Sequence, residues 1–127
     1  MVDYKKKLEN MGHKAIVHEH YIKSVNGEMP ELMERVEKEH AKLKKENGYI
    51  RWYHNEINSS DAILVLNFEK NGIENYIGGN TLMEMGFAYV VGKKIFLINP
   101  IPDTLKYKDE IEAMDPIILN GDLNLVE

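Results

Sequence analysis

Cysteine is absent from this chain of 127 residues. Its absence excludes disulfide bonds, thiolate chemistry and zinc sites built from cysteine. It also fits a reducing compartment, and we expect a cytoplasmic protein. Proline is scarce, with 4 residues, and no apolar run approaches the length of a transmembrane helix, so we expect no membrane partner.

Positive charge is scarce in the second half of the chain. The net charge is −5, and residues 61–127 hold 5 Lys and Arg against 11 Asp and Glu, whereas residues 1–60 are balanced. An acidic half repels a polyanion, so the composition argues against duplex nucleic acid and leaves a small neutral or mono-anionic ligand. With 43% apolar and 29% charged residues, we expect one domain, residues 1–127, with its own core.

Hydrophobic periodicity predicts a mostly helical first half. Apolar residues at helical spacing predict an amphipathic helix over residues 2–11, a longer helix over 31–46 and a helical segment over 49–58. Gly12 ends the first helix, and residues 13–19 are predicted to form a short strand. Residues 20–30 between them are predicted to be a loop.

The second half alternates strands with helices. Continuous apolar runs predict buried strands over residues 62–67, 94–98 and 116–119. A helix start at Asn80 and Thr81 predicts a helix to about Val91, and a shorter helix is predicted over 108–113. The order αβααβαβαβ predicts an α/β fold, a single-domain open parallel sheet of flavodoxin- or Rossmann-like type with helices on both faces.

Glu84 is a carboxylate near the start of an otherwise apolar helix, and such a charge needs a physical reason. One explanation is a capping box, in which Thr81 caps the helix and Glu84 reaches back to the Thr81 amide. The other is that Glu84 faces a cleft at the carboxyl edge of the sheet, where open α/β sheets bind ligands, and acts as a nucleophile. The local pattern alone favours the cap.

Three stretches add to this pattern. Asp61 opens the apolar run AILVL, the segment Gly79-Asn80-Thr81-x-x-Glu84-x-Gly86-x-Ala88 follows, and Gly92-Lys93-Lys94 precedes the next predicted strand. In this order and spacing they resemble the nucleoside 2-deoxyribosyltransferase family, which includes the deoxynucleoside 5'-monophosphate N-glycosidases. The resemblance covers about residues 55–100.

The resemblance implies cleavage of the N-glycosidic bond of a 2'-deoxynucleoside or its 5'-monophosphate, by hydrolysis or by base exchange. Glu84 would attack C1' and form a glycosyl-enzyme intermediate, with Asp61 as the family-matched second carboxylate. The alternative role of Asp61 is to bond backbone amides where helix meets strand. No cofactor is implied. The whole domain has an alternative too, a non-catalytic nucleotide-binding or structural member of the fold.

Substrate-binding candidates cluster around the start of the same helix. They are Asn67, Tyr76, Gly78, Gly79, Asn80 and Thr81. Asn80 and Thr81 have the alternative role of capping the helix, and Tyr76 that of a packed loop aromatic. The helix is apolar nearly all round, which favours burial against another subunit, and the family is oligomeric. We therefore expect a homodimer or a larger homo-oligomer.

Relative to that family, the chain lacks the usual first strand and its glycine-containing loop. In flavodoxin-like order that strand is central, so three possibilities remain open: residues 13–19 pair with 62–67, another chain supplies the strand, or the sheet has a different order. The family's acidic residue on the helix before Asp61 is not matched by an Asp either; Tyr53, His54 or Glu56 could reach the site, and we assign the role to none of them. His18 and His20 share a strand face, but without a third ligand we expect no metal site.

Overall fold

A computed structural model describes residues 2–16 and 48–126. The chain divides into two compact units, residues 1–52 and 53–127, and each is considered by itself. The predicted loop over 20–30 and the predicted helix over 31–46 lie outside the described residues. Whether the chain forms one domain therefore stays a prediction.

In the first unit, helix α1 (Val2–Asn10) confirms the predicted N-terminal helix. It ends at Gly12, whose φ of 93° is the left-handed conformation that glycine adopts readily. The amides of Gly12 and His13 donate to the carbonyls of Glu9 and Leu8, the hydrogen bonds of a Schellman motif. Residues 13–16 are irregular, so the strand predicted over 13–19 is wrong in its described part; residues 17–19 lie outside the described residues.

Helix α5 (Tyr49–Ser59) confirms the predicted helical segment and leads into the second unit. It follows Gly48, whose φ is 61°. At its other end the hydroxyl of Ser60 donates to the carbonyl of Glu56 at 2.6 Å, which satisfies a carbonyl of the last turn. The turn at Ser59 and Ser60 then delivers the chain to the sheet.

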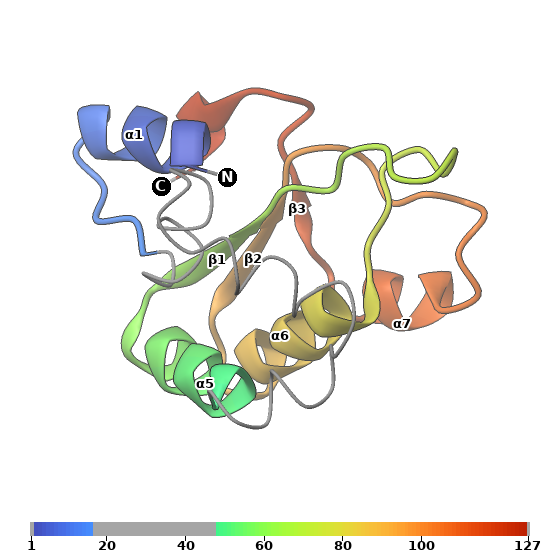
Figure 1. The fold of residues 1–127 in the computed structure, drawn as a ribbon, viewed down its shortest axis with the longest axis horizontal. Coiled ribbons are helices and arrows are strands. Elements are labelled where there is room, and N and C mark those ends of the chain that lie inside the picture. The colour runs from blue at the N-terminus through green and yellow to red at the C-terminus, as the bar shows by residue number, and fades with distance from the viewer. Residues whose placement is uncertain (1, 17–47, 127) are drawn as a thin grey trace, which may run out of the picture. The chain divides into compact units, whose positions relative to one another are not determined.

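The second unit holds a small open parallel sheet (Figure 1). Its strands are β1 (Ala62–Val65), β2 (Lys94–Leu97) and β3 (Ile117–Ile118), in the order β1-β2-β3. Each strand is shorter than the apolar run that predicted it. The α/β class and the parallel sheet are thus confirmed, while the described strands do not show the larger flavodoxin- or Rossmann-like sheet.

Helices connect the parallel strands in the expected places. Helix α6 (Gly79–Val90) joins β1 to β2, and α7 (Lys108–Ala113) joins β2 to β3. A 3-10 turn, η1 (Leu123–Leu125), was not predicted; the Asp122 carboxylate caps it by accepting from the Asn124 amide at 3.0 Å. Asx capping of this kind is local and depends on backbone geometry, which the apolar pattern does not reveal.

One face of the sheet carries the main hydrophobic core. Because partner residues in register point to the same side, Ile95 and Leu97 of β2 share this face with Val65 of β1. Helices α5, α6 and α7 cover it with Ile57, Met85, Ala88 and Ile111, which belong to the same buried cluster. The three helices lie in a row beneath the strands in Figure 1.

The opposite face of the sheet is buried in part, since Ile117, the β3 partner of Phe96, is 43% exposed. Phe96, Ile98 and Leu119 are 2%, 1% and 0% exposed. Two-sided burial is what the continuous apolar runs of parallel strands predict. The helices of the main core cover the first face only, so helices on both faces remain a prediction.

Helix α6 is less evenly buried than its apolar sequence suggested. Met85 and Ala88 are fully buried against the sheet, whereas Tyr89 is 55% and Val90 82% exposed. Exposed apolar side chains at one helix end fit the expected subunit contact but do not identify it. The oligomer stays a prediction.

Candidate functional site

Asn67 and Asn99 fasten the carboxyl ends of β1 and β2 to each other. The Asn67 Nδ2 donates to the carbonyls of Asn99 and Pro100 at 2.9 and 3.2 Å, and its Oδ1 accepts from the Asn99 amide at 3.0 Å. The Asn99 Nδ2 returns a bond to the Asn67 carbonyl at 3.0 Å. These side chains extend the strand pairing beyond the point where the two backbones separate.

This arrangement bears on the predicted role of Asn67. The side chain is 0% exposed, and both its donor and its acceptor are bonded to backbone groups. A buried amide that is satisfied in this way stabilises the site's framework. Direct contact with a ligand would require these hydrogen bonds to break.

The loop from Phe68 to Gly78 begins with a tight hairpin. Lys70 and Ile73 exchange both backbone hydrogen bonds, and the two residues between them have positive φ, 52° at Asn71 and 81° at Gly72. A two-residue turn of type I′ requires that conformation and favours Asn-Gly. The Asn-Gly pair is therefore sufficient to predict this hairpin, which the apolar pattern alone does not indicate.

Tyr76 is packed against the chain that leads into α6. A Cβ built on Gly78 would lie 3.3 Å from a ring carbon of Tyr76, so the glycine permits this close approach. The Lys70 Nζ lies 5.9 Å from the centroid of the same ring, within reach of a cation–π interaction. The structure thus brings together Tyr76 and Gly78, two of the predicted substrate-binding residues.

Tyr107 ties this region to the start of α7. Its hydroxyl donates to the carbonyl of Ile77, a fully buried residue directly before Gly78. Burial raises the pKa of the Tyr107 phenol, and the neighbouring Tyr76 raises it further. Tyr107 was not among the predicted site residues, because its partner is a backbone carbonyl that no sequence pattern marks.

The start of α6 corrects the capping-box interpretation. The N-cap residue is Gly78, extended at φ −83° and ψ 173°, and no side chain caps the helix. The Leu82 amide donates to the Gly78 carbonyl at 2.9 Å, so the N-cap lies three residues before Thr81, where the capping box would have placed it. Thr81 and Asn80 are therefore helical residues, not caps, and Glu84 lies in the second turn.

Glu84 is half-buried at about the middle of α6. Met85 next to it is completely buried, and a Cβ at Gly86 would meet nothing within 4 Å. The prediction that Glu84 completes a capping box with Thr81 is wrong, because Thr81 is not at the N-cap position. The helix start therefore offers no explanation for a carboxylate at this position.

Asp61 lies at the amino end of β1, away from the residues at the start of α6. It is exposed, it directly precedes β1, and its carbonyl accepts from the amide of Lys94, the first residue of β2. Lys94 closely follows the end of α6, and a helix of 12 residues is roughly 18 Å long. The structure therefore does not bring Asp61 to the end of α6 where Gly78, Gly79, Asn80 and Thr81 lie.

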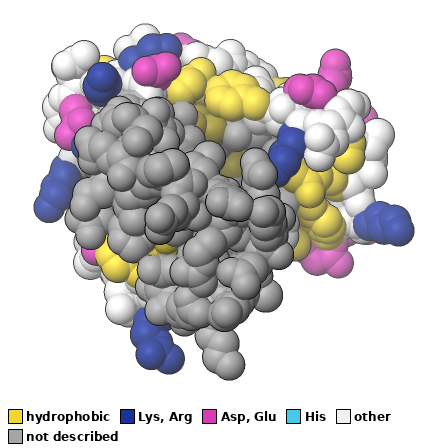
Figure 2. Space-filling model, viewed as in Figure 1, with side chains coloured by type: hydrophobic (Ala, Val, Ile, Leu, Met, Phe, Trp, Pro, Cys, Tyr) yellow, Lys and Arg dark blue, Asp and Glu magenta, His cyan; other side chains and the backbone are white. Residues whose placement is uncertain are grey.

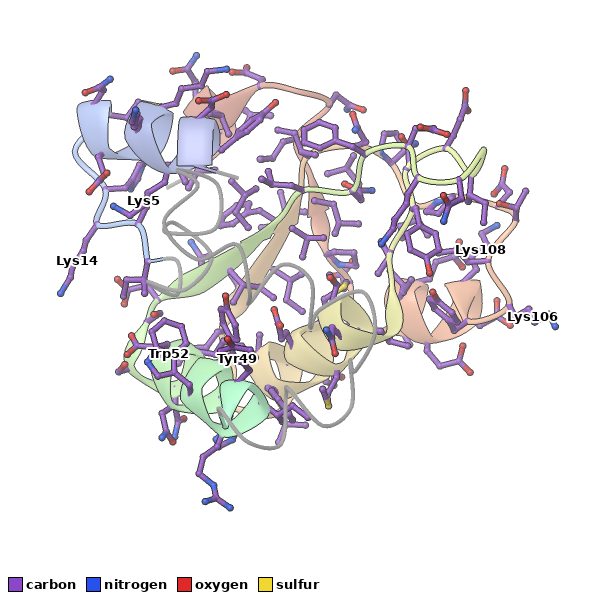
Figure 3. The ribbon with its side chains drawn as sticks, in the orientation of Figure 1. Lys5, Lys14, Tyr49, Trp52, Lys106 and Lys108 are labelled. Atoms are coloured by element: carbon purple, nitrogen blue, oxygen red, sulfur yellow. The ribbon has the colours of Figure 1, made fainter. Side chains whose placement is uncertain are left out.

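Lys108, the first residue of α7, forms two ion pairs. The Lys108 Nζ lies 2.9 Å from Asp103 Oδ1 and 3.5 Å from Glu112 Oε1. The carboxylate of Asp103 raises the pKa of Lys108, and Lys108 lowers the pKa of Asp103. Lys106 on the same segment points away from it (Figure 3). Basic and acidic side chains are interspersed on the described part of the face in Figure 2.

Within residues 2–16 and 48–126, no three His, Asp or Glu side chains are grouped so that they could hold a metal ion. No helix in these ranges combines the length and apolar content that crossing a membrane requires. His18 and His20 lie outside the described residues.

Comparison with protein-family models, with curated proteins and with solved structures gives no match. The resemblance to nucleoside 2-deoxyribosyltransferases therefore rests on the residues of this chain alone, and the activity that it implies is a proposal.

Proposed function

We propose that the protein cleaves the N-glycosidic bond of a 2'-deoxynucleoside or its 5'-monophosphate, with Glu84 as nucleophile. One observation carries the proposal. Glu84 is a half-buried carboxylate in the second turn of an apolar helix, where it cannot serve as part of a capping box. It lies in a helix that follows the carboxyl end of β1, and open parallel sheets bind their ligands at that edge, so its position favours a role in chemistry or in binding.

In the proposed reaction, Glu84 attacks C1' of the deoxyribose as the bond to the base breaks. The ionised carboxylate stabilises the oxocarbenium-like transition state and then forms the glycosyl-enzyme ester. Water releases the sugar in a hydrolase, and a second base takes it in a transferase. The departing base needs a proton. Because Asp61 lies beyond the opposite end of α6, we keep its acid role only as the assignment that the resemblance implies.

The second candidate is a non-catalytic nucleotide-binding or structural protein of the same fold. Two observations favour it. Asn67, proposed to contact substrate, is fully buried and bonded to backbone. Asp61 and the start of α6 flank different ends of the helix. Such a protein would bind nucleotides without turnover or would not bind them at all.

Base release measured by chromatography tests the proposal. The substrates are the deoxynucleosides and their 5'-monophosphates, each with and without a second free base. We expect base release by the wild type and a loss of at least about a thousandfold in Glu84→Gln, which removes the nucleophile but little volume. Glu110→Gln, an exposed carboxylate of α7, is the matched control and should retain the wild-type rate.

The two candidates predict different results. If the folded wild type releases no base from any substrate, or if Glu84→Gln retains activity, the nucleophile assignment is wrong. Titration calorimetry with the same nucleotides then separates a binding protein from a purely structural one.

A further inference from the structure

The chain contains two described Asn-Gly turns with nearly the same backbone. Asn71 and Gly72 have φ values of 52° and 81°, and Asn120 and Gly121 have 50° and 82°. All four residues are exposed. Each pair also closes a tight turn, because the residue after the glycine donates its amide to the carbonyl of the residue before the asparagine. The two turns thus share both sequence and local conformation.

The partner of the glycine amide distinguishes the two turns. The Gly72 amide donates to the carboxylate of Glu69, with 2.6 Å between nitrogen and Oε1. The Gly121 amide donates to the carbonyl of Ile98 at 2.8 Å. A carboxylate accepts a proton readily, whereas a peptide carbonyl does not. Only the first turn therefore places a base on the amide nitrogen that follows an asparagine.

We propose that Asn71 is a site of self-catalysed deamidation, with Glu69 as the general base. Glu69 takes the amide proton of Gly72, and the Gly72 nitrogen attacks Cγ of Asn71. The bond from Cγ to Nδ2 then breaks, and Nδ2 leaves as ammonia with the proton that Glu69 returns. Water opens the resulting succinimide to aspartate or isoaspartate. Gly72 has no Cβ to hinder the attack, and the space around it is open.

The modification would change the loop in two ways. It adds a negative charge between Glu69 and Glu74 in a loop that already carries both carboxylates. Isoaspartate also lengthens the backbone by a methylene group, which is incompatible with the two-residue turn that pairs Lys70 with Ile73. The loop leads directly to the start of α6, so its shape would then depend on the age of the protein. This inference does not rest on the proposed glycosidase activity.

Peptide mapping by mass spectrometry of the full folded chain, incubated at neutral pH, tests the proposal. We expect Asn71 to deamidate at least about tenfold faster than Asn120, the contribution of a modest general base. Glu69→Gln keeps an oxygen acceptor but not the base, and should slow Asn71 to about the rate of Asn120. Glu74→Gln, the matched control in the same loop, should leave the rate unchanged.

Several results would overturn it. Equal rates at the two asparagines, or no deamidation at Asn71, would show that the carboxylate gives no assistance. A rate that is unchanged or higher in Glu69→Gln would show that the hydrogen bond is neutral or protective. In urea-unfolded protein the deamidation rates of Asn71 and Asn120 should converge. A rate difference that persists in urea would show that the local sequence causes it, and would contradict a role for the folded hairpin. Circular dichroism verifies that each variant is folded.

Discussion

Asn67 and Asn99 each donate a side-chain hydrogen bond to the other's main-chain carbonyl, across a sequence separation of 32 residues. These side-chain hydrogen bonds take the place of backbone pairing at the point where β1 and β2 end. It makes the two loops that follow the strands dependent on one another.

We expect Asn67→Ala to lower the free energy of unfolding by about 3 kcal/mol, because it leaves the part-buried Asn99 amide and the carbonyls of Asn99 and Pro100 without their partner. Denaturant unfolding measures the change. Asn58→Ala, an exposed residue of α5, is the control and should change the stability little. A loss in Asn67→Ala as small as that of the control would mean that water replaces the amide.

Thr81→Ala tests the corrected start of α6. Loss of an N-cap threonine costs about 1 kcal/mol or more, whereas a threonine inside a helix has no such role. Since Gly78 occupies the N-cap position, we expect the substitution to be neutral or slightly stabilising in thermal unfolding. If Thr81→Ala instead lowered the stability by the amount expected for an N-cap, Thr81 would be the N-cap residue and the corrected helix start would be wrong.

Gly86 and Gly92 should respond to alanine with opposite signs. Gly86 lies inside α6 with open space around its Cα, so Gly86→Ala should stabilise the protein by about 0.5–1 kcal/mol. Gly92 follows the helix with φ of 75°, so Gly92→Ala should destabilise it. Both are measured by denaturant unfolding. If Gly86→Ala is stable yet inactive in the base-release assay, the glycine two residues after Glu84 is needed for access rather than for folding.

Tyr107 should make the stability fall at alkaline pH. Its pKa in the folded protein is raised above the ordinary 10.0, so the folded state holds the phenol proton more tightly than the unfolded state. The stabilising contribution of the protonated Tyr107 phenol is complete below about pH 10 and is lost as the pH rises through the pKa of Tyr107 in the folded protein. Tyr107→Phe should reduce this pH dependence and cost about 1 kcal/mol at neutral pH.

The measurement is unfolding at several pH values, combined with the ultraviolet absorbance of tyrosinate. Tyr89→Phe, at a 55% exposed position, is the control and should keep the wild-type alkaline profile. An unchanged profile in Tyr107→Phe would assign the alkaline loss to other groups, including Lys108, whose pKa is also raised.

Local patterns predicted the elements whose signals lie within a few residues. The helix before Gly12 and the helix from Tyr49 follow from periodicity and neighbouring glycines, the short helix over 108–113 was also predicted, and the apolar runs located the three strands within the described residues. Strand ends were less predictable, because apolar runs such as Ala62–Asn67 continue past the ladder. There the final residue, Asn67, bonds to a partner 32 residues away.

The candidate site was harder to predict because its geometry depends on where α6 begins. The Thr81-x-x-Glu84 pattern fits a capping box, but the Gly78-Gly79 pair lets the helix start earlier, which moves Glu84 into the second turn. The position of Asp61 relative to the helix start follows from strand direction and helix length together. The bond from Tyr107 to the Ile77 carbonyl depends on tertiary packing alone.

That bond also has a consequence for the order of folding. It joins residues 30 apart in the chain, and a loop of that length must lose entropy before the contact forms. We therefore expect the turn before α6 to become fixed only after α7 has docked, later than the local pairing in the Lys70–Ile73 hairpin. In hydrogen exchange, the amides at the beginning of α6 should then open together with α7 rather than with the middle of their own helix.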